Sequence, residues 1–212
     1  MTLKTKLLTF ALLAFFFGNA FAAENIKGKP QISQDKAIKN FIAWDKKLKT
    51  LDTFYTQEVS FEGTSISKTF GRILKENNLL RLDTLEDGKV TQYAITDKNI
   101  IKIFDEKNNP VMNMSWQSWQ ETQQNKSLFD FGNYENIFKE HKVLSFEGIK
   151  DGYTLILTPK EEPSYILTFV LDKNFFPKEI ILINEGVMSK TTLQKTKINP
   201  NITKENIQWK EK

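Results

Sequence analysis

The sequence predicts an α+β fold made mainly of antiparallel strands, about 10–11 in number, in one sheet that curls or closes. Apolar residues recur at helical spacing in only two parts of the chain, 33–50 and 121–141. Most of the remainder alternates apolar and polar residues in short runs, separated by turn-forming pairs such as Asn77-Asn78 and Asp87-Gly88. A sheet of that many strands twists and cannot stay flat, so we expect a concave face. The N-terminal helix and the helices from the middle of the chain either plug this face or cover a cavity in it.

Residues 1–22 have the pattern of a secretory signal peptide. Two lysines precede an apolar run from Leu7 to Phe17, and the stretch ends in Ala20-Phe21-Ala22. We expect cleavage after Ala22 and export to the periplasm. The run is too short for a transmembrane helix, although an uncleaved N-terminal anchor is the alternative. The remainder, 23–212, is expected to form a single domain with a flexible leader at 23–33.

The composition excludes several kinds of chemistry. The chain has no cysteine and one histidine, which rules out a disulfide scaffold, a thiolate metal site and a cysteine nucleophile. It contains no phosphate-binding loop, dinucleotide fingerprint or nucleophile elbow. The net charge of +4, two units of which come from the lysines of the signal peptide, is too small to indicate nucleic-acid binding. We therefore expect a binding protein rather than an enzyme, with no cofactor and no metal.

The predicted elements follow in order along the chain. The first helix, 33–50, has Ser33 as its N-cap and buries Ala37 and Phe41, with Asp45 among the polar residues of the remaining surface. Helical spacing at 121–141 predicts one or two short helices, and His141 at their end is expected to be structural. The predicted strands are 54–61, 69–75, 79–85, 89–96, 99–105, 142–149, 153–159, 165–171, 177–184, 187–198 and an edge at 207–209.

The segment 111–119 breaks the alternation and is the first candidate for a binding surface. It places Met112, Met114, Trp116 and Trp119 among polar residues. Methionine beside tryptophan provides adaptable apolar surface that suits ligands of variable shape, and it suits the cap of a hydrophobic core equally well. The position of this segment, in the middle of the sheet sequence, favours a lid.

Carboxylates at strand ends and turns are the second candidate. Paired carboxylates can hydrolyse glycosidic bonds, which leaves a hydrolase as the least favoured alternative. An exposed sheet also carries acidic residues at its turns for solubility. The acidic residues in question are Asp83, Glu86, Asp87, Asp105 and Glu106.

Four stretches carry a family resemblance through their order and spacing. They are Leu51-Asp52-Thr53-Phe54-Tyr55-Thr56-Gln57, Phe70-Gly71-Arg72-Ile73-Leu74-Lys75 followed by Leu80-Arg81-Leu82, the hairpin 93–104 with its Asp97-Lys98-Asn99 turn, and Tyr153-Thr154-Leu155-Ile156-Leu157-Thr158-Pro159-Lys160. Together they resemble the LolA family, the periplasmic lipoprotein carriers of Gram-negative bacteria. The resemblance covers most of the chain after the signal peptide.

The resemblance implies a soluble monomeric carrier, built as a half-open β-barrel that is covered by helices. Such a carrier takes the acyl chains of lipoproteins from an inner-membrane ABC transporter complex into an apolar cavity and passes them to an outer-membrane acceptor. Another lipid or a glycolipid in the same fold is the alternative cargo. Strand alternation within this picture predicts that the cavity is lined by Tyr55, Val59, Phe61, Phe70, Leu80, Leu82, Met112, Met114, Trp116, Phe129 and Phe131.

The sequence departs from the family pattern at one place. The family has an Arg-Pro pair after the glycine-containing strand, and its arginine is associated with latching the lid. Glu76-Asn77 occupies the corresponding place here. The latch is therefore absent, or Arg72 or Arg81 serves in its place.

Overall fold

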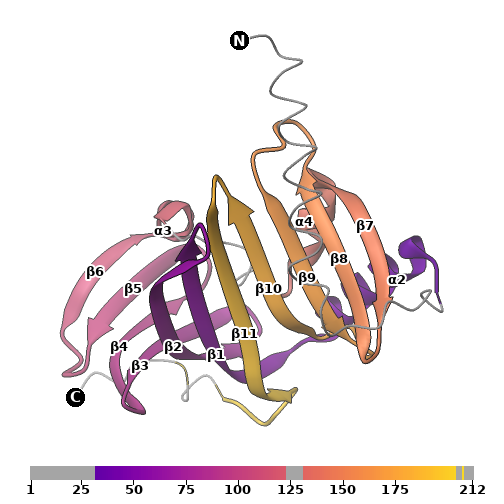
Figure 1. Cartoon of the computed structure of the whole chain (residues 1–212). Helices are drawn as coiled ribbons and strands as arrows, with labels where there is room; N and C mark the ends of the chain where they lie inside the picture. Colours follow the sequence, from indigo (N-terminus) through magenta and orange to yellow (C-terminus); the bar gives the residue numbers. More distant parts are fainter. Residues whose placement is uncertain (1–31, 123–130, 204–206, 208–212) are drawn as a thin grey trace.

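The computed structural model describes residues 32–122, 131–203 and 207. These residues form eleven strands in one antiparallel sheet together with helices α2, α3 and α4 (Figure 1). The elements in chain order are α2 (Gln34–Lys47), β1 (Thr50–Phe61), β2 (Thr64–Glu76), β3 (Leu79–Glu86), β4 (Lys89–Thr96), β5 (Ile100–Asp105), β6 (Pro110–Ser115), α3 (Trp116–Thr122), α4 (Tyr134–Glu140), β7 (His141–Ile149), β8 (Gly152–Pro159), β9 (Ile166–Asp172), β10 (Pro177–Asn184) and β11 (Val187–Ile198).

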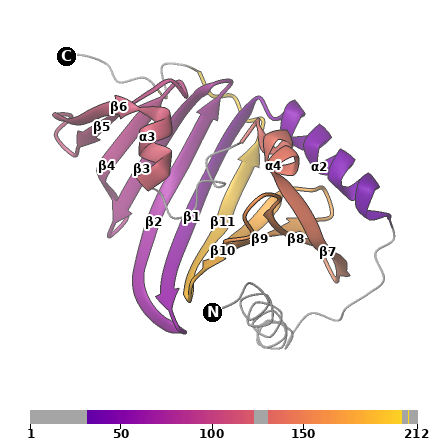
Figure 2. The same ribbon diagram turned by 90° about the horizontal axis from the view of Figure 1, so that it is seen from above.

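The sheet is open, with β6 at one edge and β7 at the other. Its strand order is β6-β5-β4-β3-β2-β1-β11-β10-β9-β8-β7. Two meanders, β1–β6 and β7–β11, are joined in the middle by the antiparallel pairing of β1 with β11. The sheet curves strongly, and the view from above shows a half-barrel (Figure 2). The predicted fold class, a curled and half-open antiparallel barrel with a few helices, is confirmed.

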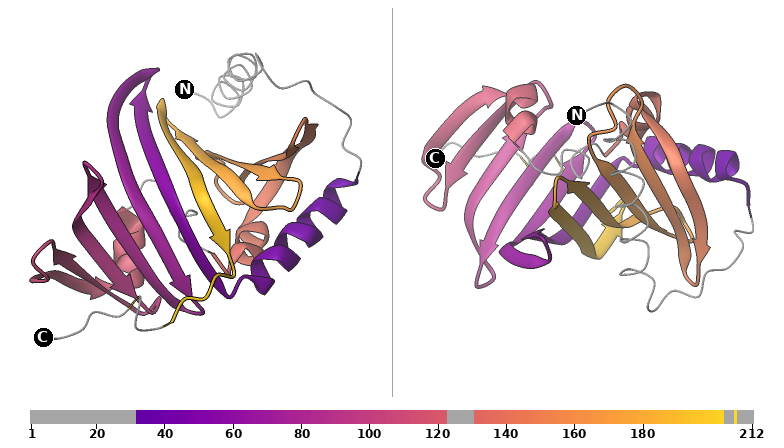
Figure 3. Two further views of the ribbon diagram at one scale, coloured as in Figure 1. Left: turned by 90° about the horizontal axis from the view of Figure 1, so that it is seen from below. Right: turned by 45° about the horizontal axis from the view of Figure 1, so that its top comes forward.

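Each half of the sheet has its own helical cover. Helix α3 follows β6 directly and packs mainly on β5 and β6, whereas α4 leads into β7 and packs on β7 and α2. The views from below and from an oblique angle show α2 and α4 beside the β7–β9 half of the sheet (Figure 3). Side chains from all three helices join one hydrophobic cluster with the strands, so the helices cover the concave face.

Helix α2 forms where the sequence predicts it. Ser33 is its N-cap, and the hydroxyl oxygen accepts a hydrogen bond from the amide of Lys36 at 3.4 Å. Lys46 and Lys47 lie in its last turn, where positive charge interacts favourably with the helix dipole. The buried positions 37, 41 and 45 are one turn apart, and they fix the side of the helix that meets the sheet.

Two strand predictions were wrong. Residues Pro110–Ser115 form strand β6, because Met112 and Met114 pair with Ile103 and Ile101 of β5 and continue its alternation. The predicted edge strand at 207–209 does not form at Ile207, which is buried in a helical conformation; 208 and 209 lie outside the described residues. The predicted signal peptide and nearly all of the predicted leader lie outside them as well. Within the described ranges, no helix has the length and apolar character needed to cross a membrane.

Candidate functional site

Strand register decides which side chains face the helices. Tyr55 lies opposite Gly71 on β2 and Leu193 on β11, and Ile73 lies opposite Leu82 on β3. Because side chains on one face of a sheet recur at every second residue, these positions share the concave face. The row continues across β4–β6 through Ala94, Ile103 and Met112.

Aromatic side chains fill the part of the concave face nearest α2. Phe41 of α2 lies 5.2 Å from Tyr134 of α4 and 5.3 Å from Phe169 of β9, measured between ring centroids. Phe131 lies 5.5 Å from Tyr134, and all four rings are almost fully buried. Offset and edge-on packing of this kind stabilises the helices against the sheet. On the other half of the sheet, two buried tryptophans of α3, Trp116 and Trp119, stack on each other with their ring centroids 4.9 Å apart.

A buried carboxylate on α2 holds the start of α4. Asp45 is only 2% exposed, although the sequence suggested an exposed position for it. Its Oδ1 accepts from the Gly132 amide at 2.6 Å and its Oδ2 accepts from the Tyr134 amide at 2.9 Å. Asn133, the N-cap residue of α4, makes no side-chain cap of its own. Burial raises the pKa of Asp45, while the two amides oppose that rise.

Two lysines from the β1–β6 half lie near the same turn, and Lys98 donates a hydrogen bond to it. Lys98, between β4 and β5, donates from Nζ to the Phe131 carbonyl at 2.9 Å. Lys75, almost fully buried at the end of β2, donates to the carbonyls of Leu48 at 3.2 Å and Asn77 at 2.7 Å. Burial and the nearby Lys98 charge lower the pKa of Lys75 to about 8, and Asp45 opposes that shift. The turn at 131–134 is thus tied to both halves of the sheet.

The far end of α4 is also held by polar contacts. Lys160 donates from Nζ to the carbonyls of Phe138 at 3.2 Å and Lys139 at 2.6 Å, at the negative end of the helix dipole. His141 is buried, with Nδ1 2.8 Å from the Ile137 carbonyl and Nε2 2.7 Å from the Tyr165 hydroxyl. The single histidine of the chain therefore has a structural place at a helix-to-strand junction.

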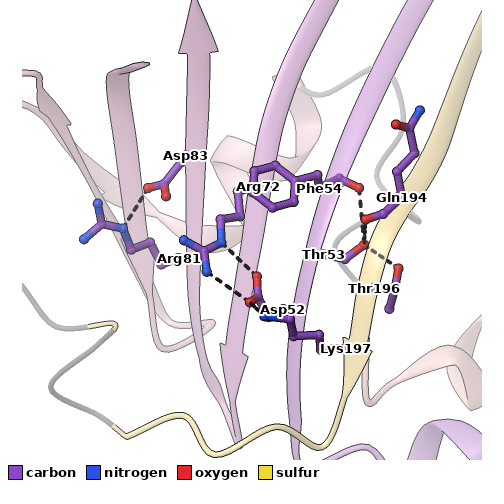
Figure 4. A network of polar contacts seen from close by, with 9 residues as sticks. All are labelled: Asp52, Thr53, Phe54, Arg72, Arg81, Asp83, Gln194, Thr196 and Lys197. Carbon is purple, nitrogen blue, oxygen red and sulfur yellow. Dashed lines mark hydrogen bonds and ion pairs between the residues drawn. The ribbon is translucent and has the colours of Figure 1, made fainter. Parts of the chain in front are cut away.

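The two arginines considered as lid latches point elsewhere. Arg72 makes a bidentate ion pair with Asp52, at 2.8 and 3.0 Å, and Arg81 pairs with Asp83 at 2.7 Å (Figure 4). Arg72 lies opposite Phe54 and Asp83 in the register, which puts it on the convex face. Neither arginine therefore contacts the helices through these pairs. Lys98 contacts the 131–134 turn instead, through the carbonyl of Phe131.

The structure separates the predicted lining residues. Buried on the concave side are Tyr55, Val59, Leu80, Leu82, Trp116 and Phe131, with Met114 half-buried beside them. Met112 shares that face but is 45% exposed on the edge strand, and Phe61 is exposed at the tip of the β1–β2 hairpin. Phe70 is 49% exposed and lies on the convex face with Arg72, two residues along its strand. Phe129 lies outside the described residues.

The carboxylates considered for catalysis have local partners. Asp83 pairs with Arg81. Asp105 accepts from the backbone amides of Lys107 and Asn109 within its own turn, and the side chain of Asn109 lowers its pKa. Glu86, Asp87 and Glu106 are exposed at the ends and turns of strands. Within the described ranges, no three histidine or acidic side chains come together in a way that could hold a metal ion.

Sequence patterns did contain a signal for the polar contacts that were missed. Asp45 follows Ala37 and Phe41 at intervals of four, on the buried face of α2. Lys75 follows Gly71 and Ile73 at intervals of two, on the apolar face of β2. A charged residue in phase with buried positions indicates a buried polar contact, because an unpaired buried charge is too costly to keep.

Comparison with known proteins gives a likeness of fold. No protein-family model matches the sequence, and no curated protein does either. The crystal structure of MucB superimposes with a TM-score of 0.53 and 13% identity, over 86% of this chain and 65% of MucB. In fold, the chain is similar to MucB.

Other solved structures with similar folds include a LolA superfamily protein and a lipoprotein-sorting domain. The LolA superfamily protein, from Nitrosomonas europaea, has a TM-score of 0.49 and 10% identity, over 84% of this chain and 98% of its own. The second is a putative outer membrane lipoprotein-sorting protein domain from Vibrio parahaemolyticus, with a TM-score of 0.48 and 7% identity, over 81% and 94%.

Proposed function

We propose that the protein is a periplasmic carrier that binds the acyl chains of lipoproteins on the concave face of its sheet. In this role it would receive them from an inner-membrane transporter complex and deliver them to an outer-membrane acceptor. The observation that carries the proposal is the open sheet itself, whose apolar concave face is covered by helices rather than by a second sheet. The sequence resemblance to lipoprotein carriers supports the same role.

The physics of acyl chains explains why such a face is needed. Each CH₂ group left in water costs about 0.8 kcal/mol, so a chain crossing an aqueous compartment needs an apolar surface around it. Helix α3 offers one side of that surface through Trp116 and Trp119, and the sheet offers the other through Leu80 and Leu82. Helix α3 packs mainly on β5 and β6, whereas α4 packs on β7 and α2. A movement of α3 away from α4 would therefore leave the pairing of the strands intact.

A matched pair of variants tests the proposal. Met112 and Phe70 are exposed to nearly the same extent, at 45% and 49%, on opposite faces of the sheet. We expect Met112→Asp to weaken binding of a synthetic triacylated lipopeptide, measured by displacement of a hydrophobic fluorescent dye. Phe70→Asp should leave that binding unchanged. Equal effects of the two variants, or no displacement by the lipopeptide from the unaltered protein, would overturn the proposal.

Bound material from the native envelope identifies the cargo. The protein purified from the periplasm should carry acylated lipoproteins that mass spectrometry can detect. Recovery of only a free lipid or a glycolipid would replace the lipoprotein cargo by the alternative one. That alternative is favoured by the hydroxyl and amide side chains that share the concave face with the apolar ones, such as Gln57 and Thr191.

A further inference from the structure

The concave face changes character at the level of Tyr55. Toward α2, the central strands present apolar residues such as Leu51, Ile73 and Leu80. Toward the tips of the β1–β2 and β10–β11 hairpins, the same alternation brings polar residues to that face. They are Gln57 of β1, Thr69 of β2, and Ser189 and Thr191 of β11.

These four residues, which we call the polar row, lie side by side across three strands. Gln57 is directly opposite Thr69 on one side and Thr191 on the other. The amide nitrogen of Gln57 donates to the Ser189 hydroxyl oxygen at 3.2 Å. Residues opposite each other on one face have Cβ atoms about 4.5–5.5 Å apart, so one small polar group can contact two of them at once.

Thr191 is the member that lacks a partner. Its side chain is 0% exposed, and among the residues that the structure describes none forms a hydrogen bond with its hydroxyl oxygen. Buried hydroxyl groups are almost always paired, because an unpaired one loses its hydrogen bonds to water and gains nothing in return. An unpaired buried hydroxyl beside an amide and a second buried hydroxyl indicates a place where a ligand group completes the hydrogen bonds.

We propose that the polar row binds the carbonyl oxygen of the ester or amide bond through which an acyl chain is attached to its carrier molecule. A carbonyl oxygen accepts two hydrogen bonds, and the Thr191 hydroxyl and the Ser189 hydroxyl both have a hydrogen to donate. The donors of the row are uncharged, which suits a neutral carbonyl. The chain itself would extend past Tyr55 toward the apolar part of the face. This inference rests on the proposed function and adds the chemical class of the ligand.

Two matched ligands test the proposal. A dipalmitoyl glycerol ester and the dihexadecyl glycerol ether have equal chains, but only the ester has carbonyl groups. We expect Thr191→Val to weaken binding of the ester about three- to ten-fold, the worth of one neutral hydrogen bond, and to leave binding of the ether unchanged. Thr191→Ser, which keeps the hydroxyl, should retain the ester affinity. The control is Thr192→Val, on the convex face of the same strand.

The outcomes separate this inference from the proposed function. Wild-type protein that binds neither ligand contradicts both. Wild-type protein that binds ester and ether equally well, with Thr191→Val affecting both alike or neither, contradicts the carbonyl site alone. In urea unfolding, empty Thr191→Val should be at least as stable as the wild type, because it loses an unsatisfied hydroxyl. If Thr191→Val does not fold, Gln57→Met provides the same comparison of ester and ether from the facing strand.

Discussion

The carboxylate of Asp45 on α2 caps α4 by accepting from the amide of Tyr134, 89 residues further along the chain, at 2.9 Å. Its second oxygen accepts from Gly132. A helix normally receives its cap from a residue just before it, and Asn133 does not supply one here. The first and last helices of the cover are therefore joined by a buried carboxylate, and the aromatic contact of Phe41 with Tyr134 lies beside it.

Replacement of Asp45 should weaken the contact between α2 and the start of α4 and so destabilise the protein. Asp45→Asn keeps the shape but loses the charge and one of the two acceptor oxygens, so we expect the free energy of unfolding to fall by about 1–3 kcal/mol. Urea unfolding followed by tryptophan fluorescence measures the loss. Asp35→Asn, at an exposed site in the first turn of the same helix, should change stability by less than about 0.5 kcal/mol. A loss no larger for Asp45 than for Asp35 would contradict the capping role.

Lys75 predicts a pH dependence of stability. Its pKa of about 8 in the folded protein lies below the 10.5 of an ordinary lysine. Between these pH values the folded chain has already released the proton that the unfolded chain still binds, so the cost of the buried charge disappears as pH rises. Relative to Lys75→Met, the wild type should gain about 1–3 kcal/mol between pH 8 and pH 10.5. Urea unfolding at several pH values measures this.

The control for Lys75 is a lysine in solvent. Lys102→Met, at an exposed position of β5, should show the same pH dependence as the wild type. A difference between wild type and Lys75→Met that stays constant with pH would mean that the folded protein does not perturb this lysine.

Gly71 should not tolerate a methyl group. A Cβ at this position would clash with the ring of Tyr55 and with the backbone oxygen of Asp83. The ring of Tyr55 covers the glycine, so we expect Gly71→Ala to destabilise the protein by about 1–3 kcal/mol. Ser67→Ala, at an exposed site on the same strand, should change stability little. Equal melting temperatures for the two variants would show that the strand adjusts without cost.

Arg72 should matter for stability and not for binding. Its bidentate pair with Asp52 lies on the convex face, so Arg72→Met leaves a nearly buried carboxylate without its main partner (Figure 4). We expect a loss of about 1–3 kcal/mol in the free energy of unfolding. Displacement of the fluorescent dye by the lipopeptide should be unchanged for the folded variant. A selective loss of lipopeptide binding would instead make Arg72 the latch.

Lys160 should stabilise the C-terminal end of α4. Lys160→Met removes two donors from the carbonyls of Phe138 and Lys139, and we expect a loss of about 0.3–1 kcal/mol that shrinks at high salt. Lys173→Met serves as the control, because Lys173 pairs with Asp151 in full contact with solvent. Chemical unfolding at low and high salt compares the two. Equal losses for the two variants at low salt would contradict the capping role of Lys160.

Local patterns were enough to predict most of the elements, with β6 and the greater part of α3 as the exceptions. Alternation with a period of two and the turn pairs identified ten of the eleven strands, since neighbouring residues alone determine both signals. Ser33 was correctly predicted as a helix cap for the same reason. Strand β6 was missed because its alternation becomes visible only when Met112 and Met114 are placed against Ile103 and Ile101.

The spacing of apolar residues along the chain is sufficient to predict a curled antiparallel sheet with helices at two places, because this spacing encodes each element locally. Which side chains share the concave face depends on how the strands pair in three dimensions, because a shift of one residue in register moves a whole strand's side chains to the other face. Phe70 was for this reason grouped with Tyr55, although the two lie on opposite faces. The contacts of Asp45 and Lys98 with the 131–134 turn join segments far apart in the chain, so no local pattern could place them together.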